Sequence, residues 1–431
     1  MKAIKDYFVR LKIINKELSF EKKSFYIGTF FLSSALPISI FFYFISIVKA
    51  LFISKIYKIK KLNLIILFCS GLMLISTFNS VQNPNFVDFI DPNKNNIIIV
   101  GLFNWLPFFI FFFTSQIYLK TNRDRELFSK VFISGSIPVI FSCAMQYWFK
   151  SYGPFETLFG SIIWFQKFSY TNQSVTGLFN NPNITGLWLT VLIPFLFFEF
   201  WNLEKNIRNK LFLISLISLT TYFTFLTSSR NALIGLLISI CMIFGVKYFL
   251  IIPSIFFSSL ISLKFINNTL FQSDFFTGQF NLINKLLLLN SAASSRLEIY
   301  DISTKLIFEK PFLGWGPSLF PYFYEVQGGV WNAKHTHNMP LELALNYGIP
   351  VSILLTFLVL FLIVKAFRKT FNNIHSKDIF TIDKAWVSCS LIIISSHIFD
   401  INYYDGKIST LSWILLAGLT CIIDEKKNNI Y

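Results

Sequence analysis

Charged residues are scarce in this chain of 431 residues, and their scarcity excludes a soluble domain. Only 14% of the residues are Asp, Glu, Lys or Arg, whereas a soluble domain needs about 25% to cover its surface. Hydrophobic residues make up 54% of the chain. They form repeated apolar runs of about 17 to 24 residues, the length that crosses the hydrocarbon of a bilayer. We therefore expect an all-α, polytopic integral membrane protein, with residues 1–431 forming a single membrane domain.

Cysteine is also rare, and no CxxC pair is present. The five cysteines stand singly within or beside apolar runs, a pattern typical of small core residues rather than disulfides or metal ligands; they are Cys69, Cys143, Cys241, Cys389 and Cys421. A cleavage site is missing after the first apolar run, so we expect an uncleaved start rather than a removable signal peptide.

The net charge of +16 would suit a nucleic-acid partner, but its distribution indicates a membrane. Lys and Arg are concentrated in short connections between apolar runs, as the positive-inside rule requires of cytoplasmic loops. We therefore expect the lipid bilayer as a partner and no nucleic acid. The candidate spans after the first are about 62–78, 97–119, 131–149, 184–201, 211–227, 231–246, 248–266, 341–364, 385–401 and 408–423.

The first apolar segment, 24–53, has basic clusters on both sides, so it must cross the membrane an even number of times. Pro37 breaks it near the middle and predicts two short helices. Each is barely long enough to span, and a hairpin that does not fully cross is the alternative. Charge counting then predicts about twelve spans with both termini in the cytoplasm.

Two outer loops are long, about 150–183 and about 267–340, and loops of this length are usually functional or disordered. The second contains a helix signal, because Ser295 and Glu298 are spaced as a capping box and Pro311 would end the helix that follows. A tight turn containing Trp315 comes next. We expect this loop to be structured.

Three outward-facing stretches, 176–183, 227–230 and 335–342, each precede a helix that runs inward. Pro182 and Pro340 suit a first helical turn, where the missing N–H costs nothing. Helix N-termini attract anions, so three of them around one vestibule would suit a pyrophosphate.

Two arginines stand where the helix dipole disfavours a cation. Arg230 and Arg296 both fall at predicted helix N-termini, which costs about 0.3–1 kcal/mol each and suggests a bound anion that compensates. The alternative is that both side chains extend to lipid headgroups.

The chain has only four histidines, and two of them lie close together in the last outer stretch. His337 is either a structural loop histidine or a functional one. A metal site is disfavoured because His335 and His337 are spaced for opposite faces of a strand and no outer acidic or Cys cluster completes a ligand set. His397 and Asp400 are either an orienting pair or a packed polar pair, and we favour the packed pair.

Taken together, these stretches resemble the O-antigen ligase and polymerase family of membrane glycosyltransferases. The resemblance rests on GLFNNPN at 177–183, TSSR at 227–230, SSRLEIYDISTKLIFEKPFLGWGPSLF at 294–320 and HTHNMPLELALNYGIP at 335–350. It implies a glycosyltransferase C type fold and a multi-pass protein in the bacterial inner membrane. It also implies a polyprenyl-pyrophosphate-linked glycan donor, a glycolipid or glycan acceptor, and chemistry without a metal or other cofactor.

The family resemblance also assigns roles to residues. The arginines that engage the donor pyrophosphate match Arg230 and Arg296, and the essential histidine matches His337. A histidine suits a general base, and one base without a second carboxylate suits a single displacement with inversion. The predicted substrate-binding residues are Asn181, Asn183, Asn338, His335 and Trp315, although asparagines at turns and caps are more often structural.

We favour a ligase, which transfers the glycan to a lipid A-core sugar, narrowly over a polymerase, which extends a chain of repeat units. The competing reading from another class is a transporter of bicarbonate or another small anion. Against it, the sequence shows no matching pair of broken helices in two halves and no charged residue deep in a span.

Overall fold

The computed structural model describes most of the chain as helices. The described residues are 18–53, 61–82, 94–160, 162–166, 174–203, 207–245, 289–330, 333–371 and 380–425. The predicted span 248–266 lies outside them, so the expected total of about twelve spans stays a prediction.

Eight helical segments among the described residues are long and apolar enough to cross a membrane, which confirms a polytopic membrane protein. They are α4 (Lys61–Gln82), the pair α6 (Lys94–Phe103) and α7 (Leu106–Tyr118), α8 (Asn122–Trp148), α9 (Pro182–Asn202), α10 (Ile207–Leu226), α17 (Ile349–Phe371), α18 (Ile382–Phe399) and α19 (Gly406–Asp424). Two shorter apolar helices are α3 (Leu36–Ile53) and α11 (Arg230–Phe244).

The first apolar segment forms the predicted pair of helices, α2 (Phe20–Phe31) and α3. Pro37 lies in the first turn of α3, where its missing N–H costs nothing. The Ser33 hydroxyl donates to the Gly135 carbonyl of α8 at 2.6 Å. A side chain at Gly135 would collide with the Phe30 carbonyl, so glycine here lets the turn of the hairpin approach α8 closely.

Two predicted single spans are interrupted in the structure, although Asn95–Tyr118 as a whole remains long and apolar enough to be one span. The span 97–119 is broken between α6 and α7, just before Pro107. The span 341–364 is broken at Gly348, which has φ +92° and separates α16 (Met339–Tyr347) from α17. The break leaves the Ile349 amide without a carbonyl in the preceding helix. This amide donates instead to the Pro311 carbonyl, in the loop before α16, at 2.7 Å.

The long loop before α16, predicted to lie outside, contains α14 (Leu289–Glu309) and α15 (Phe320–Val326). The predicted helix end before Pro311 is confirmed, but the predicted start is wrong, because α14 begins at Leu289 rather than after Ser295. Glu298 does not cap the helix; its carboxylate accepts from the Tyr324 hydroxyl at 2.9 Å and the Val330 amide at 3.0 Å. Arg296 therefore lies inside α14, and the dipole argument does not apply to it.

The first of the two long loops contains a small antiparallel hairpin of β1 (Phe155–Thr157) and β2 (Ile162–Phe165). The Ile163 amide donates to Ser34 in the α2–α3 turn at 3.0 Å. Gln146 near the end of α8 donates to the Gln166 carbonyl at 2.6 Å and accepts from the Thr176 and Gly177 amides. This loop is therefore fixed to the helix ends on the side where α8 finishes.

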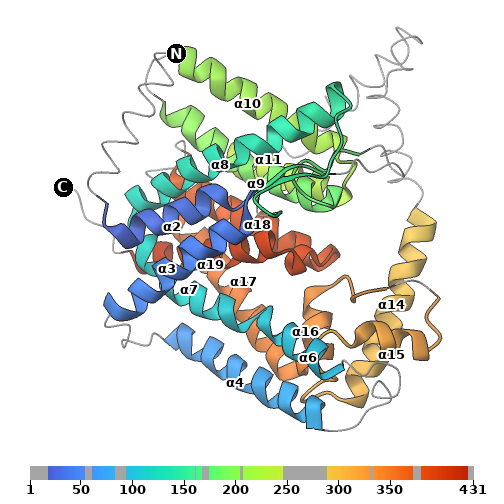
Figure 1. The fold of residues 1–431 in the computed structure, drawn as a ribbon. Helices are drawn as coiled ribbons and strands as arrows, with labels where there is room; N and C mark the ends of the chain where they lie inside the picture. The colour runs from blue at the N-terminus through green and yellow to red at the C-terminus, as the bar shows by residue number, and fades with distance from the viewer. Residues whose placement is uncertain are drawn as a thin grey trace, which may run out of the picture.

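The helices alternate in direction between two ends of the bundle, with α18 and α19 near its middle and α10 at its periphery (Figure 1). At one end the chain passes from α8 to α9 and from α18 to α19. At the other end the starts of α8 and α18 meet the finish of α19.

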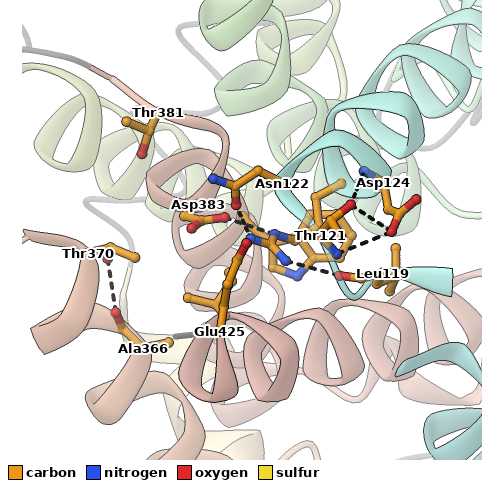
Figure 2. A network of polar contacts seen from close by, with 12 residues as sticks. Leu119, Thr121, Asn122, Asp124, Ala366, Thr370, Thr381, Asp383 and Glu425 are labelled. Carbon is orange, nitrogen blue, oxygen red and sulfur yellow. Dashed lines mark hydrogen bonds and ion pairs between the residues drawn. The ribbon is translucent and has the colours of Figure 1, made fainter. Parts of the chain in front are cut away.

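An ionic cluster around a buried arginine occupies that second end (Figure 2). The Arg125 side chain is 0% exposed, and it donates to Asp383 at 2.8 Å, to Glu425 at 2.5 Å, to the Leu119 carbonyl at 3.0 Å and to Asn122. Arg125 thereby joins the α7–α8 connection, the start of α18 and the finish of α19.

Candidate active site

Three helices begin close together at the opposite end of the bundle, as the sequence predicts. Asn181 caps α9 by accepting from the Asn183 amide at 2.8 Å. Ser229 caps α11, whose first residue is Arg230. Asn338 caps α16 by accepting from the Leu341 amide at 3.1 Å. All three predicted helix starts are confirmed.

These helix starts gather around the end of α18. The Asn183 amide group donates to the Asp400 carboxylate at 3.3 Å, and the Asn338 amide group donates to the Ile398 carbonyl at 3.1 Å. The start of α11 lies against the start of α9, because a side chain at Gly186 of α9 would touch Ser229 and Ala232, and α11 also packs against α18. The partial positive charges of three helix N-termini therefore border one region.

A histidine–carboxylate pair lies at the centre of this region. His337 Nδ1 is 3.0 Å from Asp400 Oδ1, and their side chains are 30% and 13% exposed. His337 has φ +54°, a left-handed conformation uncommon for a residue other than glycine. Its ring is thus both held by a carboxylate and open on one side.

Asp400 directly follows α18 and accepts three hydrogen bonds. Besides His337 and Asn183, the Ile401 amide donates to Oδ1 at 3.0 Å. Burial would raise the pKa of Asp400, but the hydrogen bond from His337 and the charges of His337, His335 and Arg296 together hold that pKa below its ordinary value. Asp400 is therefore a carboxylate at neutral pH, and Arg296 is near enough for its charge to act on it.

His335 lies against the same pair. Its ring centroid is 4.5 Å from that of His337, so the expectation that the two histidines face apart is wrong. The segment is a bent loop rather than a strand, and Asp400 supplies the carboxylate that the sequence pattern did not reveal. Burial, followed by the charge of His337, lowers the pKa of His335. Its Nδ1 is buried and has no hydrogen-bond partner among the described residues.

A buried carboxylate sets the shape of the 335–338 loop. Glu342 in the first turn of α16 accepts from the Thr336 amide at 2.9 Å, from Asn346 at 3.1 Å and from the Tyr404 hydroxyl at 3.0 Å. Thr336 in turn donates its hydroxyl to the Asn338 carbonyl at 2.9 Å. These bonds fix the backbone on both sides of His337.

The connection from Asp400 to Lys407 holds several parts of the site at once. Tyr404 contacts Glu342, the Tyr403 hydroxyl donates to the Asn104 carbonyl at 2.8 Å, and the Lys407 ammonium donates to the Leu178 carbonyl at 2.9 Å. Lys407 is buried and also lies over the Phe179 ring. The sequence did not indicate roles for Glu342, Tyr404 and Lys407. A signal was present for Lys407 alone, because this lysine directly precedes the apolar run 408–423.

The structure separates two further candidates from this cluster. Trp315 is held within the outer loop, where its indole N–H donates to the Leu306 carbonyl at 2.7 Å and Lys310 lies over its ring. These contacts give it a packing role, and sugar binding by Trp315 stays a prediction. His397 faces Ser412 at 3.4 Å within the bundle, so Asp400 pairs with His337 rather than with His397.

Comparison with known proteins identifies one segment of the chain. Residues 213–356 match the O-antigen ligase family, a segment that contains Arg230, Arg296, His335 and His337. Asn183 and Asp400 lie outside it. No curated protein sequence matches the chain.

Proposed function

Because residues 213–356 form an O-antigen ligase domain, which makes this chain a membrane glycosyltransferase-type enzyme, we propose that it is a ligase of lipid-linked glycans. It transfers a polyprenyl-pyrophosphate-linked glycan to a lipid A-core sugar at the outer face of the bacterial inner membrane, with inversion and without a metal. The observation that carries the proposal is the 3.0 Å contact between His337 and Asp400 among three helix N-termini.

His337 is the general base in this proposal. The Asp400 carboxylate can only accept, so the hydrogen bond between them puts the proton of neutral His337 on Nδ1 and leaves a lone pair on Nε2. That lone pair takes the proton of the acceptor hydroxyl while the hydroxyl oxygen attacks the donor sugar. Asp400 holds the ring in this tautomer and stabilises the imidazolium that forms, the task of the carboxylate in a catalytic triad.

Arg230 and Arg296 bind the donor pyrophosphate. A glycosyl pyrophosphate leaves as an anion, so departure needs positive charge rather than a proton. Arg230 begins α11, and the starts of α9 and α16 border the same region. Arg296 acts on Asp400 through its charge, so a donor pyrophosphate near Arg296 would hold its sugar within reach of His337. Asn181, Asn183, Asn338 and His335 surround this position and would contact sugar or phosphate groups.

We assign the end with His337 and Asp400 to the outer face and the end with Arg125 to the cytoplasm. The basic connections, such as 203–210, follow helices that end on the Arg125 side, which supports this orientation. The cytoplasmic placement of both termini and the total of about twelve spans stay predictions from the sequence, because they depend on residues outside the described ranges.

The test is the surface-glycolipid profile of a strain that lacks this gene, complemented with wild type or with His337→Ala. A ligase predicts core lipid without long chains, glycan accumulating on its polyprenyl carrier, and rescue by wild type alone. Core carrying a single repeat unit would instead indicate a polymerase. An unchanged profile would overturn both and redirect the search to anion uptake.

A further inference from the structure

Three metal-ligand atoms come together beside the proposed base. One donor atom each from His335, His337 and Asp400 lies within 4.8 Å of the other two. The three residues come from two separate segments, the loop before α16 and the end of α18. The Nδ1 of His335 is buried and has no hydrogen-bond partner among the described residues, so no such hydrogen bond competes with a metal for that nitrogen.

The donor set favours one class of metal. Two imidazoles and a carboxylate suit zinc and similar divalent ions, whereas magnesium and calcium prefer oxygen ligands alone. Zinc binds such ligands at about 2.0–2.2 Å, which holds neighbouring ligand atoms about 3.4 Å apart in a tetrahedron. The 3.0 Å contact of His337 with Asp400 is already that close, and His335 needs only a small side-chain movement.

The surroundings provide further features of a metal site. Asn183 donates to the second oxygen of Asp400 at 3.3 Å, and a hydrogen bond of this kind orients a carboxylate ligand. The His337 side chain is 30% exposed, so an ion can enter from solvent and keep an open fourth position. The charge of Arg296 acts on Asp400 and opposes a cation, which limits the affinity to that of a reversible site.

We propose that His335, His337 and Asp400 form an inhibitory binding site for zinc-class divalent cations. The inhibition rests on the proposed function of His337 as the base. If the metal binds Nδ1, the ring proton must sit on Nε2; if it binds Nε2, it takes the lone pair directly. In either case the base lone pair is lost, and Asp400 bonds to the metal instead of orienting the ring.

The experiment measures zinc binding directly, on full-length protein in detergent purified through a tag that contains no histidine. Equilibrium dialysis with Zn²⁺ is compared between wild type, His335→Ala and the control His375→Ala, which removes one histidine but leaves His335, His337 and Asp400 unchanged. We expect one Zn²⁺ per chain in wild type and in the control. The affinity of His335→Ala should fall by more than about 100-fold, because loss of a group that merely orients a ligand already costs about 10- to 100-fold.

Two further measurements keep the result decisive. Asn183→Ala, which retains all three ligands, should bind zinc about 10-fold more weakly, and Mg²⁺ should not compete. His335→Gln replaces His335→Ala if the alanine variant does not elute as a single species. No zinc uptake by wild type, or equal uptake by wild type and both His335 variants, overturns the site.

The same preparations separate this inference from the proposed function. Zinc should inhibit glycan transfer by wild type, and a chelator should restore it. Stoichiometric zinc binding by a protein that transfers no glycan would leave the metal site standing and refute the ligase. Zinc binding that leaves transfer unaffected would refute the inhibition.

Discussion

The two ends of α18 hold charged residues in opposite ways. At its start, Asp383 pairs with Arg125, whose side chain is fully buried and whose donors are occupied by Asp383, Glu425, Asn122 and a backbone carbonyl. At its end, Asp400 pairs with His337, which is 30% exposed, beside a His335 nitrogen that has no hydrogen-bond partner among the described residues. Saturated and buried charges stabilise a fold, whereas partly satisfied and open ones remain available for a ligand. The comparison assigns structure to one end and chemistry to the other.

The largest effect is expected at the open end. His337→Ala should lower glycan transfer by about 10²- to 10⁴-fold, the usual contribution of a general base, while the amount of protein in the membrane fraction stays unchanged. His375→Ala is the control. Full transfer activity in His337→Ala would show that the open end is not catalytic.

At the saturated end, Arg125→Met should destabilise the folded protein by about 1–3 kcal/mol, because Asp383 and Glu425, whose side chains are 20% and 33% exposed, lose a charged hydrogen-bond partner. Thermal denaturation in detergent measures the loss. The double variant Arg125→Met/Asp383→Asn should recover part of it, since one of the carboxylates is then neutral. Unchanged stability in the single variant would contradict a structural role for this cluster.

Asp400→Asn should lower transfer by about 10- to 100-fold, as loss of an orienting partner usually does, and should change how stability depends on pH. The folded-state pKa of Asp400 is lowered, so its charge stabilises the fold at neutral pH, and this contribution is lost as pH falls through the lowered value. Melting temperatures of wild type and Asp400→Asn should therefore differ at pH 7 and converge in acid. A constant difference would show that the charge of Asp400 contributes nothing.

Arg296 offers a sharper test of anion binding. Arg296→Lys should retain some donor binding, whereas Arg296→Glu should lose it, because a carboxylate would repel both the pyrophosphate and Asp400. Binding of a radiolabelled donor to purified protein distinguishes the two. If both variants bind equally well, Arg296 is merely a surface residue.

The smallest effect concerns a residue that acts at a distance. Lys407→Met should weaken the hold on the 177–183 stretch by removing the bond to the Leu178 carbonyl, and Lys407→Arg should restore part of it. We expect KM for the donor to rise a few fold with little change in kcat, because Asn183 and the α9 start would be less well placed. An equal loss in kcat and in stability would indicate general misfolding instead.

The sequence predicted the helix starts of the site because local chemistry determines them. Asparagine or serine caps followed by proline or arginine are visible in the residues themselves, and α9, α11 and α16 begin where those signals stand. The pairing of His337 with Asp400 joins residues from two separate helices, and no local signal reports it. The left-handed conformation of His337 likewise depends on contacts outside its own loop. Glu342 of α16 accepts a hydrogen bond from the Thr336 amide and another from Tyr404, which follows α18.

The wrong predictions have the same origin. The capping-box spacing of Ser295 and Glu298 predicted a helix start, but tertiary contacts of Glu298 with Tyr324 and Val330 use that carboxylate differently. The break at Gly348 was not predicted, because the apolar residues on both sides of it form one continuous hydrophobic run that matches a single span. The break forms because Pro311 accepts the amide of Ile349, a contact that only the folded outer loop supplies.

The O-antigen ligase domain is not a self-sufficient module. Residues 213–356 contain the proposed base His337 and both arginines, but the carboxylate bonded to His337 comes from Asp400, and the amide bonded to this carboxylate comes from Asn183. A chimaera that exchanges the domain alone would join a histidine from one parent to an orienting group from another. If His337 is the base, a chimaera should retain glycan transfer only when the 174–185 and 400–407 segments are exchanged together with the domain.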